Sequence, residues 1–185
     1  YDLAHHENII AVLNANSCRG FTAFGEVQGR GTKTGDPHYY KLPTPHVEGK
    51  YNVSFSGLKT AVVNEVHNAQ QRGEEVRVAD MAASFQERIA QILAKKLLAA
   101  AADTNAKTIC LAGGVAANGR LRQLVNDGAQ KLGAKVYLPE LKYCGDNGAM
   151  VAAQGYYEFL AGTRAGADLN AYATMDITQN YSLNL

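Results

Sequence analysis

Hydrophobic side chains recur every three or four positions along several parts of the chain, which is the spacing of one face of an α-helix. The strongest repeat lies in the middle of the sequence, where polar residues such as Glu87 separate the apolar ones. Its stripe consists of Met81, Phe85, Ile89, Ile92, Leu93 and Leu97. This pattern predicts a long amphipathic helix, with Asp80 as its N-cap and a stop near Asn105.

Further helices are expected over residues 58–69, 115–132 and 149–160, where weaker apolar stripes occur. Strands are expected at 51–55, which alternates apolar and polar side chains, and at the short apolar runs 108–112 and 135–138. From residue 51 the order is therefore β-α-α-β-α-β-α. That order favours an α/β fold with an open sheet and covering helices.

The first 34 residues show no sustained period, so residues 1–34 have no assigned element, and the hypothesis for this segment is an aberrant read of the sequence. The following stretch, to residue 50, contains Pro37, Pro43 and Pro45. Prolines at this density predict an extended, irregular connection rather than a helix.

The amino-acid composition and the net charge disfavour some classes of protein. The chain has 185 residues, 46% hydrophobic and 19% charged, with a net charge of +1. An ordinary core is expected, and a dedicated polyanion-binding domain is disfavoured because its affinity would come from neutralising phosphates. No apolar run is long enough for a membrane span, and the N-terminus does not resemble a signal peptide, so we expect a cytoplasmic location. The three cysteines, Cys18, Cys110 and Cys144, are widely spaced and are expected to be reduced thiols.

Two turns could carry chemistry, because each follows an expected strand and precedes an expected helix. The first contains Gly113 and Gly114, followed by Asn118. A diglycine lets a phosphate or ribose approach the backbone, and the asparagine offers both a donor and an acceptor. The alternative is a simple tight turn in which Asn118 caps the helix, and spacing alone does not separate the two.

The second turn contains Cys144, Asp146 and Asn147. Asp146 suits either a metal ligand or an N-cap, and capping is the commoner role. Cys144 is interpreted as a small buried thiol rather than a nucleophile. The segment around Lys59 lacks the spacing of a phosphate loop, so Lys59 is expected to be exposed after a strand-to-helix turn; the scattered histidines show no HExxH pattern.

Four segments occur together in an order and spacing that are more specific than any one of them: FSGLKTA at 55–61, AASFQ at 82–86, LAGGVAANGRLR at 111–122 and YCGDNGAM at 143–150. The combination resembles the carboxy-terminal part of the universal tRNA threonylcarbamoyladenosine transferase (TsaD) family, formerly called O-sialoglycoprotein endopeptidase. The resemblance runs from about Thr34 to Ile177.

The resemblance implies an actin-like ATPase fold, related to sugar kinases and Hsp70, of which residues 35–177 form mainly the second lobe and 178–185 a C-terminal tail. It implies transfer of threonylcarbamoyl from its adenylate to the adenosine that follows the anticodon. Gly113, Gly114 and Asn118 match the nucleotide-binding positions, and Asp146 matches a ligand of an active-site iron or zinc. In the implied mechanism the metal polarises the donor and the nucleotide loop orients the adenylate. No general base stands out. The implied partners are tRNA and accessory subunits, without a membrane.

The chain departs from the family pattern in ways that lower the expected activity. The other metal ligands of the family, an HxxxH pair, belong to an amino-terminal lobe that this sequence lacks, and His5 and His6 are adjacent. Gly145 replaces a usual threonine. A single aspartate does not retain a catalytic metal, so we expect little or no transferase activity from this chain alone. A kinase of the same superfold and a non-catalytic lobe that binds a nucleotide or partner remain as alternatives.

Overall fold

The computed structural model describes residues 34–167, 169 and 170. The segment 1–33 with Cys18, His5 and His6, and the tail 178–185, lie outside the described residues. The elements follow one another as α3 (Ser56–Gln71), α4 (Val78–Asp103), β1 (Thr108–Cys110), the 3₁₀ turn η3 (Gly114–Ala117), α5 (Gly119–Leu132), β2 (Lys135–Tyr137), the 3₁₀ turn η4 (Leu141–Tyr143) and α6 (Gly148–Leu160).

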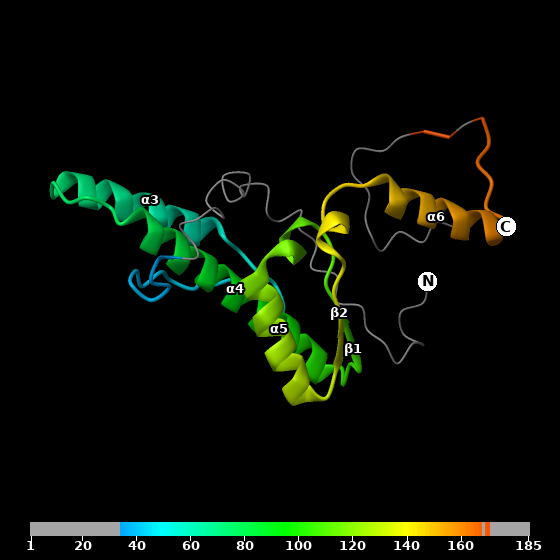
Figure 1. Cartoon of the computed structure of the whole chain (residues 1–185), viewed down its shortest axis with the longest axis horizontal. Coiled ribbons are helices and arrows are strands. Elements are labelled where there is room, and N and C mark those ends of the chain that lie inside the picture. The colour runs from blue at the N-terminus through cyan, green and yellow to red at the C-terminus, as the bar shows by residue number, and fades with distance from the viewer. Residues whose placement is uncertain (1–33, 168, 171–185) are drawn as a thin grey trace.

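The long helix predicted from the apolar repeat is confirmed as α4, and it contributes many of the core side chains. All six residues of the expected stripe face the core; Phe85 is partly buried and the other five are buried. Helix α5 packs against α4, and its Leu121 and Val125 belong to the core and are among the most buried side chains. The two helices approach closely at Gly128, where an added Cβ would lie 2.1 Å from a methyl group of Leu98 on α4. In Figure 1, α5 runs alongside α4, and the two strands lie beside the lower ends of both helices.

The sheet consists of two parallel strands in the described residues. Thr108 pairs with Lys135 and Cys110 with Tyr137, so β1, α5 and β2 form a β-α-β unit. The α/β class expected from the element order is confirmed at this level, with helices and a small parallel sheet. In a parallel pair both carboxyl ends leave the same edge. The loops after β1 and β2 therefore emerge side by side.

The strand expected at residues 51–55 does not form, because the described residues provide no neighbouring strand to pair with it. Its alternation instead places Phe55 in the core, immediately before α3 begins at Ser56. Lys59 is exposed on the first turn of that helix, as expected.

The predicted cap of α4 is wrong, whereas its predicted end is confirmed. Arg77 occupies the N-cap position and Asp80 lies in the first turn. The carboxylate of Asp80 accepts a hydrogen bond from the backbone N–H of Asp36 at 2.8 Å and pairs with Arg77 at 2.8 Å. It therefore anchors the stretch that contains Pro37, Pro43 and Pro45 (residues 35–50), called here the proline-rich segment, to α4. The helix ends at Asp103, and Asn105 adopts a left-handed φ of 52° that stops it.

Helix α6 stands away from the α4–α5 core in Figure 1. It forms where the apolar spacing predicted, but none of its residues is buried. Its large apolar side chains are exposed: Met150, Val151, Tyr156, Tyr157, Phe159 and Leu160. Among the described helices, none has the length and apolar character needed to cross a membrane.

Candidate nucleotide-binding loops

The diglycine loop leaves the end of β1 with an open backbone. Leu111 donates the last hydrogen bond of the strand pair, to the carbonyl of Tyr137 at 3.1 Å. Gly113 has a φ of +82°, which a side chain would strain, so the turn itself requires this glycine. Gly114 has no such φ, and an added Cβ would meet nothing within 4 Å. Gly114 is thus not required by local packing, and its bare backbone faces open space.

Asn118 joins this loop to both long helices of the core. Its Oδ1 accepts a hydrogen bond from the backbone N–H of Leu121 at 2.9 Å, which caps α5. Its Nδ2 donates to Oε1 of Gln86 on α4 at 3.0 Å. The capping interpretation is confirmed. Asn118 is 7% exposed, and of the two hydrogens on its amide nitrogen the bond to Gln86 uses one.

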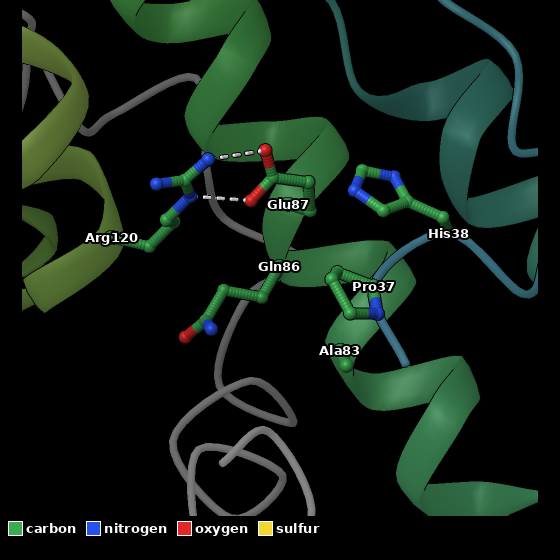
Figure 2. A pocket seen from close by; sticks show the side chains of 6 residues that line it. All are labelled: Pro37, His38, Ala83, Gln86, Glu87 and Arg120. Carbon is green, nitrogen blue, oxygen red and sulfur yellow. Dashed lines mark hydrogen bonds and ion pairs between the residues drawn. The ribbon is translucent and has the colours of Figure 1, made fainter. Parts of the chain in front are cut away.

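Gln86 also lines a cavity of about 160 Å³ between α4, α5 and the start of the proline-rich segment. Figure 2 shows its walls, which are Pro37, His38, Ala83, Gln86, Glu87 and Arg120. The cavity and the diglycine loop therefore share Gln86 and the N-terminal turn of α5.

An ion pair between Glu87 and Arg120 forms one wall of that cavity. Glu87 is 7% exposed, and its carboxylate accepts hydrogen bonds from Nε of Arg120 at 2.6 Å and from Nη2 at 2.9 Å. A third comes from Gln91 at 2.7 Å. The hydrogen bond from Arg120 is the largest cause that lowers the pKa of Glu87, and the same contact raises the pKa of Arg120. The pair is thus charged at neutral pH and ties α5 to α4.

In the loop after β2, the predicted burial of Cys144 is confirmed, whereas Asp146 is not the N-cap of α6. Cys144 is buried at 4% exposure, as expected for a structural thiol. The N-cap of α6 is Asn147 rather than Asp146, because Oδ1 of Asn147 accepts the backbone N–H of Met150 at 3.1 Å. Asp146 is exposed and has no hydrogen-bond or ion-pair partner among the described residues. Its carboxylate is therefore free to contact a ligand.

Arg122 contacts both loops from the second turn of α5. Its Nε donates to the carbonyl of Ala116 in the first loop at 2.5 Å. Its Nη2 donates to the carbonyl of Pro139 at 2.8 Å and to Sγ of Cys144 at 3.3 Å, both after β2. The guanidinium thus bridges the segment before Asn118 and the segment before Asp146.

The described residues do not assemble a metal site by themselves. They contain no group of three or more His, Cys, Asp or Glu side chains placed to hold an ion. Asp146 could supply one oxygen ligand, but sites for iron or zinc need several protein ligands. The residues described here therefore do not fit the implied metal without additional ligands.

Sequence reasoning missed the roles of Gln86, Glu87, Arg120 and Arg122. Glu87 was interpreted as one of the polar spacers of α4, and both arginines as ordinary surface charges. One signal was present: residues two apart on a helix point to different faces. Arg120 and Arg122 accordingly reach different neighbours, α4 on one side and the strand-end loops on the other.

Comparisons with known proteins agree with the resemblance carried by the four motifs. A sequence model of the tRNA N6-adenosine threonylcarbamoyltransferase family matches residues 11–153. The match begins within the segment that the sequence patterns left unassigned, and it ends before Ile177.

Curated relatives with that same name include a protein from Picosynechococcus sp., which is 43% identical over 86% of this chain and 46% of its own length. One from Desulfitobacterium hafniense is 46% identical over 77% of this chain and 42% of its own length. One from Bacillus subtilis is 43% identical over 77% of this chain and 42% of its own length. The chain therefore spans less than half the length of these relatives, and it belongs to the tRNA N6-adenosine threonylcarbamoyltransferase family.

Proposed function

We propose that this chain binds the adenylate of threonylcarbamoyl-AMP at the loop after β1, as the second lobe of an actin-like ATPase fold. In that role it would serve an acyltransferase that modifies adenosine in tRNA. The observation that carries the proposal is the open backbone at Gly114, next to the N-terminus of α5 and the amide of Asn118. Bare backbone N–H groups at a helix start are suited to an anionic phosphate.

The chemistry assigned to these residues is orientation of a leaving group. The adenosine N6 amine would attack the carbamoyl carbonyl, forming a C–N bond while the C–O bond to the AMP phosphate breaks. The AMP leaves with the electron pair, and the amine loses a proton to solvent. Gly113, Gly114 and Asn118 would hold the departing phosphate and its nucleoside in a fixed position, which lowers the entropic part of the barrier.

Asp146 is proposed as one carboxylate ligand of an iron or zinc ion whose other ligands come from outside the described residues. A lone exposed carboxylate does not hold such an ion, so no step is assigned to the metal here. The tRNA substrate, accessory subunits and a cytoplasmic location belong to the same proposal.

A second candidate is a nucleotide-binding lobe without turnover. The isolated Asp146 carboxylate favours it, because metal-assisted transfer needs a complete ligand set. In both candidates this chain on its own binds adenine nucleotides and transfers little or no threonylcarbamoyl group.

Calorimetric titration of the chain with AMP, ATP and GTP tests the shared part of the two candidates. We expect saturable binding of AMP and ATP, and weaker binding of GTP. Absence of AMP and ATP binding by a folded chain would refute both candidates. A parallel assay with threonylcarbamoyl-AMP and unmodified tRNA tests the other shared expectation: little or no transfer should occur, and transfer at rates typical of enzymes would contradict both candidates.

A further inference from the structure

Arg122 donates hydrogen bonds to two loops that, among the described residues, share no backbone hydrogen bond beyond the sheet, although both contribute side chains to the same core. The last backbone hydrogen bond between them is the one from Leu111 to Tyr137. Beyond it, the backbone hydrogen bonds of the described loops stay within each loop, as from Ala116 to Gly113 and from Cys144 to Leu141. The polar connection between the two loops therefore passes through the Arg122 side chain.

The connection through Arg122 depends on the directions of its hydrogen bonds and not on neutralisation of its charge. The acceptors are the carbonyls of Ala116 and Pro139 and the thiol of Cys144, so no carboxylate of the described residues pairs with the guanidinium. A planar guanidinium presents donors at fixed angles and can meet two carbonyls at once, whereas a lysine ammonium is a single point of charge. Helix α5, capped by Asn118, supplies a rigid base for it.

We infer that Arg122 is a positioning residue that sets the distance between the loop of Gly113–Asn118 and the loop of Cys144–Asn147. Order imposed on one loop by a ligand is then transmitted to the other. The nucleotide as ligand rests on the proposed function, whereas the coupling between the loops does not. Asp146 itself makes no described contact, so its place relative to the first loop depends on this bridge.

Hydrogen exchange, resolved by mass spectrometry into peptides from the two loops, tests the inference on the whole 185-residue chain. In the unmodified chain, saturating ATP should slow exchange in residues 113–118 and also in 143–148. In Arg122→Ala, ATP should still protect the first loop but no longer the second. Without ATP, the rate of hydrogen exchange in Arg122→Ala should be about tenfold higher in both loops than in the unmodified chain. Arg122→Lys should restore part of the protection in each loop.

Lys131→Ala is the matched control, because it removes a positive charge from the last turn of the same helix without touching either loop. In Lys131→Ala, hydrogen exchange in both loops should be as slow as in the unmodified chain, with and without ATP. An unchanged alkylation rate of the half-buried Cys110, on β1, reports that each variant keeps its fold, while the buried Cys144 should alkylate faster in Arg122→Ala.

Cys144→Ala provides a test that leaves Arg122 in place, should Arg122→Ala fail to fold. Loss of the thiol should raise exchange in the first loop as well as the second, because the arginine loses one of its anchors. Exchange changes confined to one loop, or ATP protection of the second loop that persists in Arg122→Ala, would overturn the inference. If the unmodified chain binds no ATP, the proposed function fails, and the ligand-free exchange still decides the coupling.

Discussion

Glu87 on α4 and Arg120 at the start of α5 form a two-pronged ion pair, with distances of 2.6 and 2.9 Å between guanidinium nitrogens and carboxylate oxygens. The carboxylate side chain is 8% exposed and the arginine side chain 33%. The pair holds the first turn of α5 against α4, directly beside the capping residue of the diglycine loop. Its energetic role should therefore appear both in stability and in its pH dependence.

Glu87→Gln should lower the free energy of unfolding at pH 7 by about 2 kcal/mol, less than the 3–5 kcal/mol of a fully buried pair because Arg120 is partly exposed. The pKa of Glu87 is lowered in the folded state by Arg120. The pair's contribution is thus fully present above the unfolded pKa, about 4.3, and is lost as pH falls through the lower folded pKa. Urea unfolding at several pH values measures both effects.

The matched control is Glu74→Gln, which breaks an exposed ion pair with Arg72. Its effect on unfolding should be much smaller, because exposed pairs are screened by water. The difference between the unmodified chain and Glu87→Gln should shrink as pH falls below about 4. Parallel pH profiles for the two proteins would contradict the assigned role of Glu87.

Substitutions at Asn118 separate capping from ligand contact. Asn118→Ala removes the cap and should cost about 1 kcal/mol, whereas Asn118→Ser keeps a capping oxygen and should cost less. Alanine has no donor, and the serine hydroxyl is shorter than the amide and is used by the cap, so both variants should bind AMP at least tenfold more weakly. Thermal unfolding and calorimetric titration give the two readouts. Unchanged AMP affinity in Asn118→Ser would mean that Asn118 is only a cap.

The two glycines of the loop should respond differently to alanine. Gly113→Ala places a side chain at φ 82° and ψ 173°, a region that essentially only glycine occupies, and should cost about 1–3 kcal/mol of stability. Gly114→Ala should leave stability within about 0.5 kcal/mol, because its Cβ would lie in open space. It should nevertheless weaken AMP binding, since a methyl group would stand where the phosphate approaches. Full affinity in Gly114→Ala would refute close approach at that position.

Two leucines on helices provide a matched test of the core. Leu97 on α4 is 2% exposed and Leu160 on α6 is 61% exposed. Leu97→Ala should destabilise the chain by about 2–5 kcal/mol through the cavity that it leaves. Leu160→Ala should change the stability by no more than about 0.5 kcal/mol in urea unfolding. A large loss from Leu160→Ala would show that α6 is packed in solution.

Local patterns accounted for most of the elements. The spacing of apolar residues predicted α4, α5 and α6, because a helix periodicity of 3.6 is set within a few neighbouring residues. The left-handed Asn105 that ends α4 follows from equally local chemistry. Residues 51–55 did not follow this rule, because a strand exists only where a second strand pairs with it.

The sequence by itself determined the family, through four motifs in a specific order, and the two turns that could hold a ligand. Only the tertiary structure decided which side chains support those turns. Glu87 and Arg120 are 33 positions apart, and Arg122 and Cys144 are 22 apart. Their pairing depends on how α4 crosses α5 and on the parallel register of β1 and β2. No periodicity along the chain encodes contacts at such separations, because they form only when distant elements pack together.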